Sequence, residues 1–282
     1  TSNMNKDKQL AILAGRGLIP VKVADSAQKS GWKVFIVSLN GEADKALDKY
    51  PNIKINLTEV AKIIRTLKNK NIKDILMIGY VDRPYKWKRD IGLSLLLWAI
   101  KNRDFFRRGD ASMCSKVVDF LEKKDFVVHG THEIASELVL QESIISNVAP
   151  NKNNEKDIEY GFSVARMLGN LDIGQGIVVE DRRVLAIEAA EGTDMMLERV
   201  VAIKNRKKKS INGVFIKCLQ EVQDNRIDMP TIGPVTIQKV YEAGLNGIAI
   251  SAGGVIVYDY IEVCRLLNEY NIFLVARPFN CP

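Results

Sequence analysis

The feature that most constrains this fold is an alternation of short, uninterrupted apolar runs with helical patterns in the first half of the chain. The apolar runs lie at 10–14, 34–37 and 75–78, and each is made of Ile, Val, Leu, Ala, Phe or Met. Between them, 18–29 and 60–67 repeat apolar residues at the spacing of an amphipathic helix. Wholly apolar strands separated by amphipathic helices are typical of a parallel sheet covered on both faces. The sequence therefore predicts an α/β fold.

A polar segment, VAPNKNNEK at 148–156, separates this pattern from a second one. It contains a Pro and three Asn, a composition typical of a linker. Beyond it, strand patterns such as 177–180 and 247–250 again alternate with helical patterns. We therefore expect an N-terminal α/β domain at 1–150 and a C-terminal α/β domain at 151–282, which suits roughly 150 residues per domain.

Composition excludes several classes of protein. The chain has only two histidines, so a metal site built from three or four histidines is excluded, and its four cysteines form no CxxC pair. No window reaches about 18 nearly uninterrupted apolar residues, and the first residues lack the apolar stretch of a signal peptide, so we expect a cytoplasmic protein. The net charge of +7 favours an anionic partner, which could be a phosphate substrate, a membrane surface or nucleic acid.

A glycine-flanked turn follows the first apolar run. Gly15 and Gly17 stand between the predicted strand and helix, where backbone N–H groups at a helix start can hold a phosphate. Pro20 occupies the position of the third Gly of a GxGxxG fingerprint, so a plain tight turn is the alternative.

Both histidines lie in one short segment, His129-Gly130-Thr131-His132-Glu133. The spacing is not HExxH, and no further His or Cys is placed nearby, which argues against zinc. We expect His132 to contact a substrate phosphate or hydroxyl, with structural hydrogen bonding as the alternative.

Three carboxylates, Glu188, Glu191 and Asp194, surround a Gly turn at a predicted helix start. Oxygen-rich clusters of this kind suit Mg²⁺ or Mn²⁺. The alternative is that Thr193 or Asp194 only caps the helix.

A second acidic segment, DNRIDMPTIGP at 224–234, combines two acids, an Arg, two Pro and a Gly. This composition predicts a rigid loop, in which Asp228 could be a metal ligand or a general base. The alternative is that Thr231 and Pro234 merely begin the next helix.

A basic segment at 83–108 holds eight Lys or Arg against two Asp, together with clustered aliphatic and aromatic residues. The combination suits an anionic amphiphile or a membrane surface. An amphipathic helix packed on its own domain is the alternative.

Taken together, several segments resemble one protein family. They are LAILAGRGLIP at 10–20, VVHGTHEIASELV at 127–139, GIVVEDRRVLAIEAAEGTDMMLERV at 176–200, DNRIDMPTIGPVTI at 224–237 and AGLNGIAISAGG at 243–254. They resemble the LpxI family, the UDP-2,3-diacylglucosamine pyrophosphatases of lipid A biosynthesis, from about residue 10 to residue 275. Arg16 departs from the Gly that the family usually has there, and Gly109-Asp110-Ala111 replaces a common Gly-Asp-Asp.

The resemblance implies a Rossmann-like N-terminal domain, a distinct C-terminal α/β domain and a ligand between them. It also implies metal-dependent hydrolysis of UDP-2,3-diacylglucosamine to UMP and 2,3-diacylglucosamine 1-phosphate (lipid X), with Mg²⁺ or Mn²⁺. The Asp that is critical in the family's DxPTIGP loop corresponds to Asp228. A substrate with acyl chains further implies peripheral contact with the inner membrane, and nucleic acid becomes the least favoured partner.

We therefore expect the following roles. The candidate catalytic residues are Asp228, Asp194 and Glu191. The candidate metal ligands are Asp228, Asp194 and Glu188. The candidate substrate-binding residues are Gly15, Gly17, His132, Thr193 and Thr231. A homodimer is the default expectation for assembly.

Two other functions stay open on the residues alone. An NAD-dependent Rossmann-type oxidoreductase is disfavoured by the incomplete glycine fingerprint and by Ser38-Leu39-Asn40, which puts no acid at the end of the second strand. A non-catalytic nucleotide-, RNA- or lipid-binding protein would bind with strong salt dependence and show no turnover.

Overall fold

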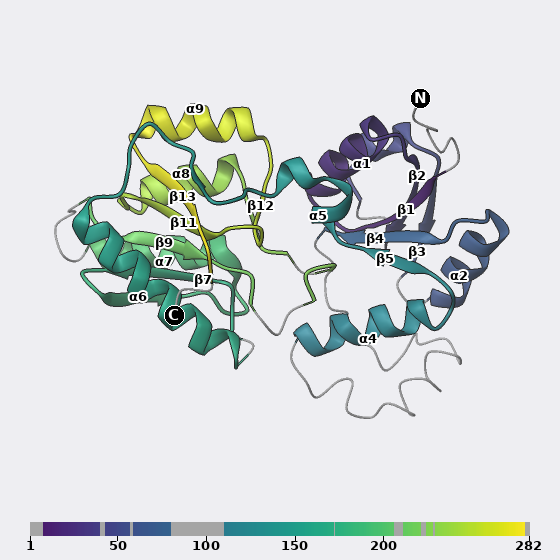
Figure 1. Ribbon diagram of the computed structural model, residues 1–282, viewed down its shortest axis with the longest axis horizontal. Helices are drawn as coiled ribbons and strands as arrows, with labels where there is room; N and C mark the ends of the chain where they lie inside the picture. The colour runs from purple at the N-terminus through teal and green to yellow at the C-terminus, as the bar shows by residue number, and fades with distance from the viewer. Residues whose placement is uncertain are drawn as a thin grey trace. The chain divides into compact units, whose positions relative to one another are not determined.

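The structure, a computed structural model, describes residues 8–39, 43–56, 59–79, 110–171, 173–205, 211–220, 224–227 and 229–279. The described residues fall into two compact units (Figure 1). Those up to Ser136, together with Arg226 and Ile227, form unit 1, and the others form unit 2. In this part of the chain, no helix is both long enough and apolar enough to cross a membrane.

Unit 1 is built on a five-stranded sheet. Its strands are β1 (Gln9–Ala14), β2 (Lys33–Leu39), β3 (Asn52–Ile55), β4 (Asp74–Ile78) and β5 (Val127–His129). The order is β3-β2-β1-β4-β5, and every neighbouring pair is parallel. This order is that of a Rossmann-like sheet, so the predicted fold of the first half is confirmed.

Helices cover both faces of this sheet (Figure 1). They are α1 (Ile19–Lys29), α2 (Val60–Asn69), α4 (Asp110–Glu122), the single turn α5 (Thr131–Ile134) and the 3₁₀ turn η1 (Lys45–Lys49). Apolar side chains of α2 and α4, including the fully buried Leu67 and Val118, pack on one face of the sheet, and α1 covers the other. The helical pattern at 94–106 lies outside the described residues.

Unit 2 contains a six-stranded mixed sheet. Its strands are β6 (Ser143–Ile144), β7 (Gly176–Glu180), β8 (Arg183–Ile187), β9 (Val214–Lys217), β11 (Gly247–Ser251) and β13 (Phe273–Arg277). The order is β6-β13-β11-β9-β7-β8, in which β9, β11 and β13 are parallel and β7 is antiparallel to β8 and β9. A separate parallel pair joins β10 (Thr231–Ile232) to β12 (Ile256–Val257).

The helices of unit 2 also lie on both faces of their sheet. α6 (Lys152–Gly169) packs on one face, and α7 (Gly192–Asn205), α8 (Pro234–Glu242) and α9 (Tyr260–Tyr270) pack on the other. A 3₁₀ turn, η3 (Ser136–Leu138), precedes these elements in the chain. Unit 2 is therefore a second α/β unit, as the sequence predicts.

The segment expected to be a linker is instead the start of α6. Asn151 is its N-cap, and the side-chain oxygen of Asn151 accepts hydrogen bonds from the backbone N–H groups of Asn153 and Asn154 at 2.9 Å. Asn is favoured at this position because it satisfies helix donors that have no intrahelical partner. The described residues accordingly divide after Ser136, whereas the sequence analysis expected a boundary at 150/151.

Candidate active site

The turn that contains Gly15 and Gly17 follows β1, at the point in the sheet of unit 1 where the order of the strands reverses. β1 and β4 are neighbours at this point, and the carboxyl ends of such strands are where open α/β sheets bind ligands. The backbone N–H of Gly15 donates to the carbonyl oxygen of Ile78 at 3.0 Å, and Gly17 has a φ of 103°. Gly79 packs against the same turn, because a Cβ there would lie 2.8 Å from Cγ of Pro20. Sequence reasoning missed Gly79, although it directly follows an apolar strand.

The two histidines have different surroundings. Nε2 of His129 lies 2.7 Å from a carboxylate oxygen of Asp74, and Nδ1 lies 3.4 Å from Glu133, so this ring is held between two acids. The ring of His132 packs against Gly130, where an added Cβ would lie 2.4 Å from Cε1. Nδ1 of His132 is buried without a hydrogen-bond partner. Both ring nitrogens of His129 therefore face protein carboxylates, whereas His132 has a ring nitrogen without a hydrogen-bond partner.

The acidic segment of unit 2 contains a buried ion pair. Glu188, directly after β8, is 9% exposed, and Lys217, the last residue of β9, is 3% exposed. Nζ of Lys217 lies 3.0 Å from Oε2 and 3.3 Å from Oε1 of Glu188. Nζ also donates to the hydroxyl of Thr193, and that hydroxyl donates to Oε1 of Glu188 at 2.9 Å. Lys217 was not predicted to be part of the site, because in the sequence it is only a charged residue at the end of an apolar run.

The other two acids of this segment do not join the pair. Glu191 forms an ion pair with Arg199 at 2.6 Å. Asp194 is exposed in the first turn of α7. It lies close enough to Tyr258 to act on its pKa, which burial raises and the charges of Asp259 and Asp194 raise further. The three carboxylates thus have three separate environments.

The predicted metal ligands can be tested against these contacts. Both oxygens of Glu188 face the Lys217 ammonium, which would repel a cation, so the surroundings of Glu188 do not fit a metal ligand. Within the described ranges, no three His, Cys, Asp or Glu side chains are grouped as a metal site would require. Asp228, the central candidate, lies outside the described residues. The described residues alone therefore do not provide a metal-ligand set.

The segment that follows position 228, predicted to be a rigid loop, is instead a short strand followed by a helix. Thr231 and Ile232 form β10, and the hydroxyl of Thr231 donates to the carbonyl oxygen of Met229 at 3.3 Å. Gly233 packs on the ring of Tyr258, since a Cβ there would lie 2.1 Å from Cζ. Pro234 then begins α8. The expected loop is thus a short paired strand followed at once by a helix.

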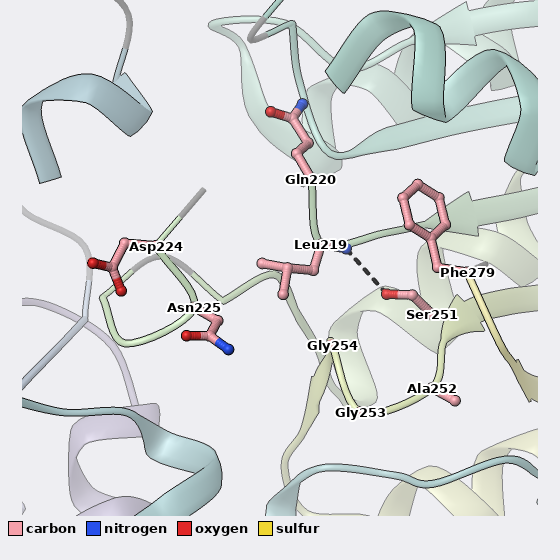
Figure 2. Close-up of a pocket in the computed structure, with 9 residues that line it drawn as sticks. All are labelled: Leu219, Gln220, Asp224, Asn225, Ser251, Ala252, Gly253, Gly254 and Phe279. Atoms are coloured by element: carbon pink, nitrogen blue, oxygen red, sulfur yellow. Dashed lines mark hydrogen bonds between the residues drawn. The ribbon is translucent and has the colours of Figure 1, made fainter. Parts of the chain in front are cut away.

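A pocket of about 360 Å³ lies at the carboxyl ends of β9, β11 and β13 (Figure 2). It is lined by Leu219, Gln220, Asp224, Asn225, Ser251, Ala252, Gly253, Gly254 and Phe279. The backbone N–H of Leu219 donates to Oγ of Ser251 at 3.0 Å, which joins two of the strand ends. Arg166 holds Phe279 by donating to its carbonyl oxygen at 2.5 Å and by lying over its ring. Asp224 and Asn225 belong to the acidic segment 224–234, whereas the sequence predicts no ligand role for the other lining residues.

The fold and these sites define a two-unit α/β protein with a Rossmann-like unit and polar groups at the carboxyl ends of both sheets. The chain belongs to the LpxI family. The LpxI N-terminal domain matches residues 9–138, and the LpxI C-terminal domain matches residues 141–275. These matches meet close to the division after Ser136.

A curated relative is similar over nearly the full length of the chain. It is the UDP-2,3-diacylglucosamine pyrophosphatase LpxI of Caulobacter vibrioides, 34% identical over 276 residues, which are 95% of this chain and 97% of the relative. A solved structure, glycinamide-RNase-transformylase T from Mycobacterium tuberculosis, is matched with a TM-score of 0.25 and 11% identity. That match covers 65% of this chain and 44% of the other, and a likeness this weak carries no argument.

Proposed function

We propose that this chain hydrolyses the pyrophosphate bond of UDP-2,3-diacylglucosamine to give UMP and 2,3-diacylglucosamine 1-phosphate. The observation that carries the proposal is the 34% identity to the Caulobacter vibrioides enzyme over 95% of the chain. Both LpxI domains are present in the same order, so neither half of the family's architecture is missing. The chain is accordingly a hydrolase that acts on a phosphoanhydride bond.

The binding groups that we propose follow from the chemistry of the substrate. A pyrophosphate diester is anionic at neutral pH, and the turn at Gly15 and Gly17 offers backbone N–H groups at the start of α1. His132 has a ring nitrogen without a hydrogen-bond partner in the structure. Thr193 and Thr231 contribute through their backbone N–H groups, since both hydroxyls already donate to other groups.

The chemical step is attack of water on one phosphorus of the anhydride, which forms a P–O bond and breaks the bridging P–O bond, so that the other phosphate leaves in the second product. We propose that Asp228 removes a proton from that water, with Asp194 and Glu191 orienting groups near the start of α7. Asp194 is exposed and can receive a ligand, whereas Glu191 first has to leave Arg199. A general base of this kind contributes roughly 10²–10⁴-fold to the rate.

Metal dependence is a separate proposal. Carboxylate oxygens such as those of Asp228 and Asp194 suit Mg²⁺ or Mn²⁺, and a bound divalent cation neutralises phosphate charge. Glu188 is left out of the proposed ligand set because its oxygens are taken by Lys217 and Thr193. We assign no step of the reaction to the metal.

One assay tests the hydrolase and its metal requirement together. Purified protein is incubated with UDP-2,3-diacylglucosamine, with Mg²⁺ or with EDTA, and the products are identified by mass spectrometry. We expect UMP and the acylated sugar phosphate in Mg²⁺ and neither in EDTA. Turnover that is equal in EDTA would contradict the metal proposal, and no turnover under any condition would contradict the hydrolase.

The role of Asp228 is tested by substitution. We expect Asp228→Asn to lower kcat by roughly 10²–10⁴-fold or more while the thermal midpoint stays near that of the unchanged protein. Asp125→Asn is the matched control, because the Asp125 carboxylate is highly exposed and its ion pair with Lys68 is long, at 3.8 Å. Full activity in Asp228→Asn would remove Asp228 from the mechanism.

Peripheral contact with the cytoplasmic face of the inner membrane is also part of the proposal, because the substrate carries acyl chains that reside in a bilayer. The basic segment 83–108 that would make this contact lies outside the described residues. A homodimer is the proposed assembly, which light scattering of the purified protein tests directly.

A further inference from the structure

The buried group formed by Lys217, Glu188 and Thr193 has no counterpart in the sequence-based account of the site. Two glycines make room for it. A Cβ on Gly174 would lie 1.8 Å from the carbonyl oxygen of Glu188, and a Cβ on Gly176 would lie 2.3 Å from its Oε2. Gly174 therefore lies against the backbone of Glu188, whose carboxylate lies between Gly176 and the Lys217 ammonium.

Counting donors indicates how this group can act. An ammonium has three N–H donors, and Nζ of Lys217 faces three oxygens, two of Glu188 and one of Thr193. The Thr193 hydroxyl in turn donates its one proton to Glu188. No side-chain proton donor of the group remains for a substrate, so these side chains act on the reaction through their neighbours.

The place of the group in the fold identifies those neighbours. Lys217 ends β9, and Glu188 follows β8, which runs in the same direction as β9. Thr193 lies in the first turn of α7, after Gly192 with a φ of 79°. The group thus ties the start of α7 to the carboxyl ends of two strands, the edge at which α/β sheets bind ligands. The residue after Thr193 is the exposed Asp194.

A buried ion pair is weak evidence for a role in stability. Taking two charges out of water is costly, and apolar residues of similar volume commonly replace such pairs without loss of stability. Thr193 also fixes the orientation of the group. Its hydroxyl accepts a hydrogen bond from Lys217 and donates one to Glu188, so the three side chains fit together in one arrangement.

We propose that Lys217, Glu188 and Thr193 form a positioning clamp, which holds the first turn of α7 so that Asp194 is presented to the substrate. Glu188 is then the counter-ion of Lys217 and no metal ligand. This proposal rests on the proposed hydrolase function.

The clamp is tested with the full chain and three variants. They are Glu188→Gln, the double variant Glu188→Gln/Lys217→Met, which removes both charges together, and Thr193→Val, which removes only the hydroxyl. Lys204→Met is the matched control. Lys204 is a buried lysine near the other end of α7. It donates to the carbonyl oxygens of Asn212 and Gly244 at 2.6 and 2.8 Å and, like Lys217, has a carboxylate partner, Glu180 at 3.6 Å.

We expect the double variant and Thr193→Val to fold and to lose tenfold or more in kcat with KM changed less than threefold. Lys204→Met should lower the thermal midpoint and keep kcat. The Mg²⁺ concentration for half-maximal activity should stay within twofold in Glu188→Gln. Wild-type kcat in a folded double variant would overturn the clamp, and so would a tenfold higher Mg²⁺ requirement confined to Glu188→Gln.

A second measurement separates failure of the clamp from failure of the proposed function. Hydrogen exchange of the backbone amides of 196–198, which donate to the carbonyl oxygens of the first turn of α7, needs no turnover. We expect faster exchange there in the double variant and in Thr193→Val, and unchanged exchange in Lys204→Met. If no protein turns over but exchange rises as expected, the hydrolase assignment fails and the clamp stands. Unchanged exchange in both clamp variants overturns the clamp.

Discussion

Asp25, on α1, links that helix to the chain segment between β2 and β3. Its carboxylate lies 2.6 Å from Nζ of Lys49 and accepts a hydrogen bond of 2.6 Å from the hydroxyl of Tyr50. Burial raises the pKa of Asp25, but Lys49 and Tyr50 lower it by more, so the net pKa is lowered. Asp25 therefore stabilises the fold in its ionised form.

This contact predicts a pH-dependent stability. An Asp with a lowered pKa stabilises the protein above its unfolded pKa of about 3.9, and that stabilisation is lost as pH falls through the folded pKa. We expect Asp25→Asn to lower the free energy of unfolding at pH 7 by less than about 1 kcal/mol, because the pair is partly exposed. In urea unfolding the difference from the unchanged protein should shrink by pH 3. A difference that is equal at pH 3 and pH 7 would contradict the ionic role.

At the same scale, the sequence located one part of the candidate site and missed another. Glu188, Thr193 and Asp194 were found because they are close together around a Gly turn. Lys217 is brought to Glu188 from 29 residues away by sheet pairing, which no local pattern reveals. The acidic residues could therefore be predicted from the sequence, but the ion pair of Glu188 with Lys217 could not.

Among the elements, the longest apolar runs were predicted to within one or two residues. β1 and β2 are buried along most of their length, and Ile75 and Leu76 of β4 are fully buried, so hydrophobicity alone marks these strands. β3 was missed because Asn52–Ile55 alternates polar and apolar residues at the sheet edge. The two-residue strand β10 was missed because pairing with β12 defines it, and its own composition does not.

The glycine turn of unit 1 gives a prediction at this scale. Gly79 has a φ of 100°, and a Cβ there would lie 2.8 Å from Pro20 and 2.9 Å from the backbone of Gly15. We expect Gly79→Ala to lower the free energy of unfolding by more than about 2 kcal/mol, because strain in the left-handed region alone costs about 1–3 kcal/mol and a clash adds to it. Urea unfolding measures the change.

Gly17→Ala is the matched control for that measurement. Gly17 has a similar φ of 103°, but an added Cβ would meet nothing within 4 Å. Gly17→Ala should therefore lower the free energy of unfolding through backbone strain alone. The decrease should be smaller than that caused by Gly79→Ala. If both substitutions lower the free energy of unfolding equally, the close approach of Gly79 to the β1–α1 turn does not contribute to stability.

For the whole molecule, the net charge of +7 favours an anionic partner. The chain has 41 Lys and Arg against 34 Asp and Glu, and eight of the basic residues lie in 83–108 among aliphatic and aromatic side chains. An anionic bilayer attracts such a segment at about 1 kcal/mol per Lys or Arg near the surface, and salt weakens the attraction. Peripheral binding of this origin needs no membrane-spanning helix.

Cosedimentation with lipid vesicles tests this prediction. We expect the protein to bind vesicles that contain phosphatidylglycerol in low salt, to dissociate as NaCl rises, and to leave phosphatidylcholine vesicles unbound. Changing Lys86, Lys88 and Arg89 to Gln should lower the partition coefficient roughly 100-fold, since three such residues contribute about 3 kcal/mol together. Changing Lys207, Lys208 and Lys209 to Gln removes the same charge from the other basic run, at 204–209. An equal loss in both variants would mean that net charge alone drives binding, and that 83–108 is not the membrane-contacting segment.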